Sequence, residues 1–218
     1  MVESENKKPA TMESCPEQET GNLKACLKSY YLSSRFTDMT IVTTEKEFKV
    51  HKLLVCSQSG FFARIFDGYW LETSTSSVKL MEDDSRFVQV MIDFMYGCHY
   101  DSSENRHSSS MLFHIGAYQI ADKYDIPNLK KYAKSQFERL VKIGWVMDDF
   151  PLAIAEAYAA NPTSDRGLRD AIVRTASLHF SELLEKGSFV KVREDTPGFS
   201  ADMAKHIFRV QRIKNSGW

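Results

Sequence analysis

The chain has 218 residues, which suits one domain with an extension or two small domains. Its formal net charge is −1, so composition alone does not point to a nucleic acid or an anionic membrane as an obligatory partner. No apolar run approaches the length of a membrane span, and the first residues lack the apolar core of a signal peptide. We therefore expect a cytoplasmic or nuclear protein with four free cysteine thiols: Cys15, Cys26, Cys56 and Cys98.

The chain is predicted to begin with a disordered tail over residues 1–22, because this segment is polar and nearly free of large apolar side chains. A short helix is expected next, from 23 to 32, with an apolar stripe at helical spacing: Leu23, Leu27, Tyr30 and Tyr31. The stripe could fold onto its own domain or pack on a partner subunit. Exposed apolar side chains so close to a polar tail favour the second alternative, packing on a partner subunit.

Residues 35–66 combine strand, turn and helix patterns. Two strands are predicted, at 39–44 and 48–51, because their residues are β-branched or alternate between apolar and polar. The polar residues 44–47 form the turn between them. Leu53 to Cys56 is apolar and leads into a helix. Ser59 can cap the next helix, whose apolar residues are Phe61, Phe62, Ile65 and Phe66.

The middle of the chain predicts a third strand and a buried helix. Residues 77–81 alternate as a strand does, and Asp83, Asp84 and Ser85 supply caps for a helix over 86–97. This helix is apolar on nearly every side, which predicts a central, buried position. If Phe94 is buried, its change to alanine should cost about 3–5 kcal/mol. Residues 98–110 are polar and predict a loop.

The second half of the chain predicts helices only. One helix is expected over 111–124, and Pro127 suits the first position of the next. Further helices are expected from Pro151 to Asn161, from Leu168 through Leu183 with an end at Gly187, and from about residue 200 to 212.

No arrangement of residues points to catalysis or to a metal. His51 and Cys56 could form a thiol–imidazole pair, but the sequence offers no oriented base or oxyanion site beside them, which favours a structural cysteine and a hydrogen-bonded histidine. Cys98, His99, His107 and His114 could suggest a zinc site, but their spacing contains no Cys-x-x-Cys or His-x3-His pair of the kind that holds zinc. We expect no cofactor, no metal and no enzymatic activity.

Several motifs resemble the BTB (POZ) domain family. Asp38 precedes the first strand, Phe48-Lys49-Val50-His51-Lys52 matches the second, and Ser59-Gly60-Phe61-Phe62 opens the following helix. Later, Ala121-Asp122-Lys123-Tyr124 and Pro127-Asn128-Leu129 match the family's helix pair. The resemblance spans residues 23–142. It implies an α+β fold, a small sheet with a helical cluster, followed by a helical extension over 143–218 like those of small fungal BTB proteins and MATH-BTB adaptors.

The resemblance also implies interaction sites. Asp38 and Lys52 match the charged pair that lines the dimer groove of BTB transcription factors, so the expected homodimer interface contains both residues and the apolar stripe of residues 23–31. Trp70 and Glu72 fall where adaptors for cullin-3 ubiquitin ligases carry an apolar-x-Glu motif. Trp70 could instead simply cover the preceding helix.

These implications give two alternatives for function. The chain could be a homodimeric adaptor that brings an unknown client protein to a cullin-3-type ubiquitin ligase. It could also be a homo-oligomerising scaffold or transcriptional cofactor with no ligase role. The absence of a recognisable Kelch or MATH domain weighs against the adaptor, and the absence of zinc fingers or a basic stretch weighs against a DNA-binding factor.

Overall fold

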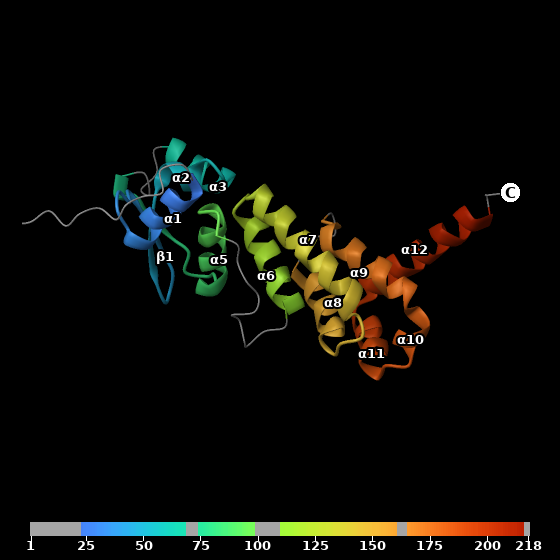
Figure 1. Ribbon diagram of the computed structural model, residues 1–218. Coiled ribbons are helices and arrows are strands. Elements are labelled where there is room, and N and C mark those ends of the chain that lie inside the picture. The colour runs from blue at the N-terminus through green and yellow to red at the C-terminus, as the bar shows by residue number, and fades with distance from the viewer. Residues whose placement is uncertain (1–22, 69–73, 99–109, 161–164, 216–218) are drawn as a thin grey trace, which may run out of the picture.

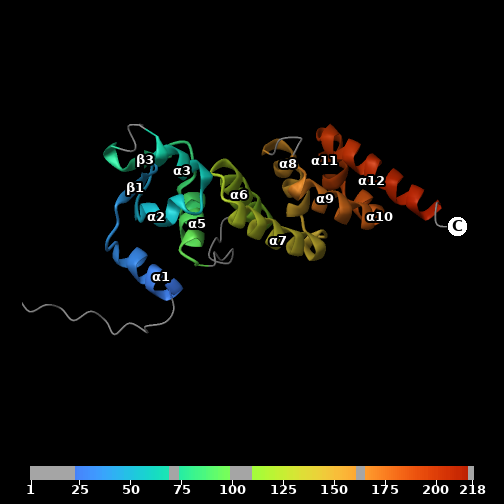
Figure 2. The same ribbon diagram turned by 90° about the horizontal axis from the view of Figure 1, so that it is seen from above.

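The computed structural model describes residues 23–68, 74–98, 110–160 and 165–215. These residues form an elongated molecule with the sheet at one end and a helical extension at the other (Figure 1). Helices α6 and α7 lie between the two ends, a position that the view from above also shows (Figure 2). The expected α+β fold with a helical extension is confirmed.

The sheet has three short strands in the order β2-β1-β3 within the described residues. They are β1 (Met39–Val42), β2 (Glu47–Val50) and β3 (Ser77–Lys79), close to the predicted segments. β1 pairs antiparallel with β2 and parallel with β3. Ile41 lies opposite Phe48 on one side and Val78 on the other, and all three are buried. The alternation of apolar and polar residues therefore sets which face of the sheet meets the core.

Three helices flank the first two strands in the chain. α1 (Leu23–Ser33) precedes them, and α2 (Lys52–Cys56) and α3 (Gly60–Asp67) follow. The predicted cap of α3 is confirmed, because the Ser59 side chain accepts a hydrogen bond from the Phe62 backbone N–H at 3.2 Å. Phe62 is fully buried, while the other apolar residues of α3 are half-buried.

Helix α5 (Ser85–Met95) is the expected central helix, capped by Asp84. It is not buried on every side. Val88, Met91 and Ile92 lie in the core, whereas Phe94 is half-buried and packs against Tyr132 at 5.6 Å between ring centroids. The condition set on Phe94 is therefore met only in part, because this residue lies on the outer face of α5 and is half-buried.

Helices α6 (Ser110–Lys123) and α7 (Pro127–Gly144) form the expected pair, with Pro127 at the start of α7. Their junction also anchors α3. The Ser59 hydroxyl donates to the Tyr124 carbonyl at 2.6 Å, and the Gly60 N–H donates to the Asp125 carbonyl at 3.0 Å. A Cβ at Gly60 would lie 2.1 Å from an Asp125 side-chain oxygen. A larger residue at position 60 would therefore have to displace the Asp125 carboxylate, which pairs with Arg64.

The extension consists of α8 (Asp149–Ala160), α9 (Gly167–Leu178), α10 (Phe180–Leu184), α11 (Gly187–Asp195) and α12 (Pro197–Asn215). α8 packs on α6, and α9 packs on α7. Asp165 links the parts: it accepts from the Tyr118 hydroxyl at 2.8 Å and pairs with the Lys130 ammonium at 2.8 Å. α7 passes the expected boundary at residue 142. The domain division stays a prediction.

Two expectations for the extension were wrong. The helix predicted from 168 to 183 is broken at His179, whose ring stacks on Trp145 with centroids 3.8 Å apart. The stack accompanies a non-helical backbone at His179 (φ −114°), so α9 ends and α10 begins on either side of it. The last helix begins at Pro197, earlier than expected, because Pro197 opens the helix whose Phe199 is buried.

The predicted tail at 1–22 and most of the predicted loop at 98–110 lie outside the described residues.

Candidate protein-interaction surface

A hydrogen-bonded network around Tyr96 joins the end of α5 to β2 and to the segment after α1. The Tyr96 hydroxyl accepts from the His51 backbone N–H at 2.9 Å and lies 2.6 Å from His51 Nδ1. His51 Nε2 lies 2.8 Å from the Arg35 carbonyl, which can only accept. The tautomer that fits both contacts has the proton on Nε2, which donates to the Arg35 carbonyl, and accepts the Tyr96 O–H at Nδ1. Burial raises the pKa of Tyr96, which keeps this hydroxyl protonated.

Tyr31 attaches α1 to the same network. Its ring stacks on that of Tyr96 with centroids 4.4 Å apart and an interplanar angle of 18°. Its hydroxyl accepts from Gln89 Nε2 at 2.7 Å, and Gln89 also donates to Asp93. Burial, and then the Asp93 charge, raise the pKa of Tyr31. Leu27 also packs against the core. One side of the predicted apolar stripe thus contacts its own domain, while the Leu23 side chain lies outside the described residues.

Asp38 and Lys52 are in contact, but the Asp38 side chain binds the backbone N–H of Lys52 and not its ammonium group. Asp38 Oδ1 accepts from the Lys52 backbone N–H at 2.7 Å, and this N–H belongs to the first turn of α2. The Lys52 ammonium instead lies over the Phe66 ring, 4.0 Å from its centroid. Asp38 therefore satisfies an N–H that the helix leaves without a partner, and it places a negative charge at the positive end of α2.

Three large apolar side chains near these residues face solvent, and sequence reasoning missed them. Leu32 is 73% exposed on α1, Phe36 is 72% exposed just after it, and Leu53 is 82% exposed on α2. Phe36 follows Arg35, and Leu53 lies two residues after His51, so the Arg35–His51 hydrogen bond holds their segments together. We call Leu32, Phe36 and Leu53 the exposed apolar trio. Phe36 stands between two polar neighbours, a signal that the sequence did contain.

A family model for the BTB/POZ domain matches residues 27–139, which is more than half of the chain. The chain belongs to the BTB/POZ family. The BTB domain is a protein-interaction module. The matched region runs from α1 into α7 and includes the Tyr96 network and the exposed apolar trio.

Curated relatives of this BTB protein carry further domains. The human "Kelch repeat and BTB domain-containing protein 4" is 24% identical over 170 residues, which cover 78% of this chain and 28% of the relative. The "BTB and MATH domain-containing protein 15" of Caenorhabditis elegans is 33% identical over 90 residues, 40% of this chain and 33% of the relative. A horsepox virus "Kelch repeat and BTB domain-containing protein 1" is 28% identical over 78 residues, 36% of this chain and 14% of the relative. The chain thus spans under a third of the length of its Kelch–BTB relatives.

The two residues predicted to dock a cullin, Trp70 and Glu72, lie outside the described residues. The described chain on either side of them is α3, which ends at Asp67, and β3, which begins at Ser77. Their role in this BTB domain stays a prediction, as does the homodimer interface.

Cys56 and His51, the pair considered for catalysis, lie in surroundings that favour a structural role over a catalytic one. Burial raises the pKa of the Cys56 thiol, which opposes formation of the reactive thiolate, and His51 is engaged by Tyr96 and Arg35. Across the described part of the chain, no group of three His, Cys, Asp or Glu side chains could hold a metal. His99 and His107 lie outside it. None of the described helices is long and apolar enough to cross a membrane.

Proposed function

We propose that the chain is a homodimeric BTB adaptor that recruits a client protein to a cullin-3-type ubiquitin ligase. The main support for the dimer is the exposed apolar trio on and near α1. Large apolar side chains that gather on the surface of a protein-interaction domain often mark a contact with another protein. A two-fold interface would bury the trio together with the predicted dimer residues: Leu23, Leu27, Tyr30, Tyr31, Asp38 and Lys52.

In this dimer, α1 and the residues after it have separate roles. Tyr31 faces Tyr96 and holds α1 in place, while Tyr30 contacts the Phe36 ring edge to face, 5.5 Å between centroids. Asp38 holds the start of α2, which carries Leu53. The polar contacts thus position the elements, and the exposed apolar trio supplies the contact area.

The cullin part of the proposal rests on Trp70 and Glu72 in the segment between α3 and β3, and on BTB relatives that carry Kelch or MATH domains. Trp70 would fill an apolar pocket on the N-terminal helical repeat of a cullin, and Glu72 would accept hydrogen bonds at its rim. A buried aromatic anchor contributes a large contact area at low entropic cost.

The test is calorimetric titration of a cullin-3 N-terminal fragment against the full chain. Trp70→Ala should weaken binding by about 2 kcal/mol, roughly thirtyfold, and Glu72→Ala should weaken it less. Both variants should keep the wild-type mass and melting temperature. If wild type shows no binding at tens of micromolar, about 6–7 kcal/mol, the scaffold function replaces the adaptor. If Trp70→Ala unfolds the chain, Trp70 belongs to the core. Equal binding by wild type and variant would contradict the site but keep the adaptor.

A further inference from the structure

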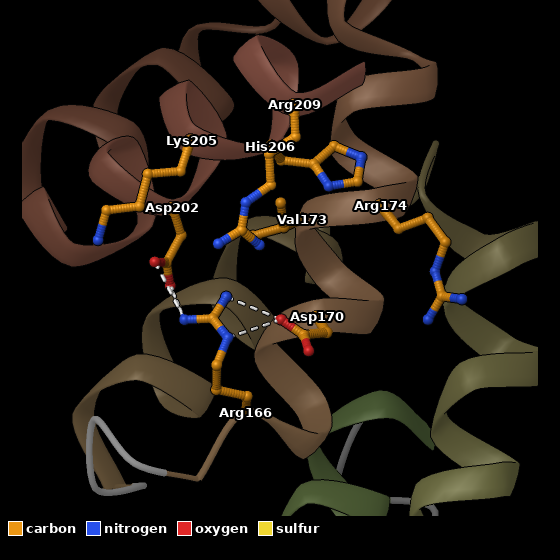
Figure 3. Close-up of a pocket in the computed structure, with 8 residues that line it drawn as sticks. All are labelled: Arg166, Asp170, Val173, Arg174, Asp202, Lys205, His206 and Arg209. Atoms are coloured by element: carbon orange, nitrogen blue, oxygen red, sulfur yellow. Dashed lines mark hydrogen bonds and ion pairs between the residues drawn. The ribbon is translucent and has the colours of Figure 1, made fainter. Parts of the chain in front are cut away.

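A basic pocket lies between α9 and α12 in the extension (Figure 3). Its volume is about 320 Å³, at the lower end of the range of roughly 300–1,000 Å³ typical of ligand sites. Arg166 and Asp170 form one wall, and α12 contributes the opposite wall through Asp202, Lys205, His206 and Arg209; Val173 and Arg174 complete the lining. Four arginine and lysine side chains face two carboxylates, a surplus of two positive charges (4 − 2) with His206 neutral.

Both carboxylates of the pocket are already bound to a single guanidinium. Arg166 NH1 contacts the two Asp202 oxygens at 3.1 Å each, and its Nε and NH2 reach Asp170 at 2.9 and 2.7 Å. The side-chain hydrogen bonds from Asp202 and Asp170 raise the pKa of Arg166. Both carboxylates therefore pair with Arg166, and among the described residues neither makes an ion pair with the cations of α12.

The cations of α12 have no such counter-charge. Neither Lys205 nor Arg209 makes an ion pair within the described parts of the chain. Figure 3 shows the Arg209 guanidinium directed across the pocket toward Arg166, with the His206 ring beside it. The one ion pair of the Arg174 side chain with the described residues is a long contact with Glu138, at 3.8 Å. The Arg209 guanidinium thus faces the open pocket with no carboxylate paired to it among the described residues, so it would attract an anion that enters the pocket.

We propose that this pocket binds a phosphoryl group at the Arg209 guanidinium. Guanidinium groups match the geometry of phosphate oxygens and bind them through paired hydrogen bonds. Lys205 adds a positive charge from the same helix. The phosphoryl group comes either from a phosphorylated serine or threonine of a partner segment or from a free phosphate. The proposal is independent of the dimer and of the cullin site, because every lining residue belongs to the extension.

The first experiment is an amide-shift NMR titration of the full-length, isotope-labelled chain with sodium phosphate, at constant ionic strength set by sodium chloride. We expect saturable shifts in α12 and at the start of α9. Arg209→Gln should weaken binding at least tenfold, about 1.4 kcal/mol, and should leave the fold intact because Arg209 has no ion-pair partner in the described chain. Arg212→Gln is the matched control, since it removes the same charge from the same helix outside the pocket.

Two outcomes would overturn the proposal: no saturable shift up to about 10 mM phosphate, or equal weakening by Arg209→Gln and Arg212→Gln. A second arm identifies the source of the phosphoryl group, with a short neutral peptide carrying phosphoserine and the same peptide carrying serine. Tighter binding of the phosphopeptide than of inorganic phosphate assigns the pocket to a partner segment. Binding of inorganic phosphate without the phosphopeptide assigns it to free phosphate. Equal binding of both peptides would overturn the phosphoryl specificity.

Discussion

At the scale of single residues, Tyr96 shows how one hydroxyl can fix a surface. Its side chain is 1% exposed, and it carries the ring on which Tyr31 stacks and the oxygen that holds His51. His51 in turn holds the carbonyl of Arg35. The position of α1 and of the residues after it therefore depends on a side chain at the end of α5.

We predict that Tyr96→Phe lowers the free energy of unfolding by about 1–3 kcal/mol, because it leaves the His51 backbone N–H and Nδ1 without their partner. Urea denaturation followed by circular dichroism measures this change. Tyr30→Phe is the control, because the Tyr30 hydroxyl makes no hydrogen bond among the described residues; it should stay within about 0.5 kcal/mol of wild type. A Tyr96→Phe variant as stable as wild type would show that the network does not hold α1.

His114 makes stability depend on pH. It is 5% exposed, and burial first, then the charge of Arg139, lowers its pKa to about 4 from a usual 6.5. Between these values the unfolded chain binds a proton that the folded chain does not. The stabilising contribution is therefore complete above pH 6.5 and is lost as the pH falls toward 4.

The expected loss between pH 7 and pH 5 is about 2 kcal/mol from this residue. Urea midpoints at the two pH values measure it, and His114→Gln, which does not titrate, should show a correspondingly smaller difference. The comparison uses the change with pH and not the absolute stability, so any packing defect in the variant cancels. An identical pH dependence in both proteins would contradict a lowered pKa at His114.

At the scale of elements, α5 has a buried face and a partly covered face. Ile92 is fully buried, and Phe94, two residues later, is half-buried against Tyr132. α6 packs closely on this helix: a Cβ at Gly116 would lie 2.1 Å from the Phe87 ring. The close approach of α5 and α6 thus depends on a glycine and on the direction of each α5 side chain.

Ile92→Ala should cost about 2–5 kcal/mol, since it opens a cavity in the core. Phe94→Ala should cost less, about 1–2 kcal/mol, because part of that ring already meets solvent. Chemical denaturation of the two variants under the same conditions ranks them. The reverse order would mean that Phe94 is covered in solution, as it would be if a partner packed on this face of α5.

At the scale of the whole molecule, the two proposed sites lie at opposite ends, one at the sheet end and one in the extension (Figure 1). The exposed apolar trio lies at the sheet end on α1, α2 and the residue Phe36, and the basic pocket lies between α9 and α12. α6 and α7 connect them through packing on α8 and α9. A dimer formed at the sheet end would leave the extension of each subunit free for other partners.

The proposed dimer predicts that Leu53→Asp weakens self-association at least tenfold, about 1.4 kcal/mol, because it places a charge in an apolar interface. Light scattering across micromolar concentrations measures the mass of each protein. Leu178→Asp is the matched control, because Leu178 is 75% exposed, comparable to the 82% of Leu53, but lies on α9 in the extension. A wild-type chain that stays monomeric throughout this range would rule out the dimer.

The sequence by itself determined the fold class and most of the elements. Local signals were sufficient for the Ser59 cap, the Pro127 helix start and the alternating strands, because each depends on neighbours only a few residues away. The BTB motifs were sufficient for the family, and the match over residues 27–139 confirmed it. The expected dimer and cullin residues follow from that resemblance and stay predictions.

Only the tertiary structure decided how residues distant in the chain meet. The contact of Tyr31 with Tyr96, the use of Asp38 on a backbone N–H, and the break at His179 all arise from partners that lie between 14 and 65 residues away. The half-buried position of Phe94 depends on which face of α5 the rest of the fold covers. Periodicity gives the spacing of residues along one helix, but burial and ion pairing depend on the side chains that other elements bring to it.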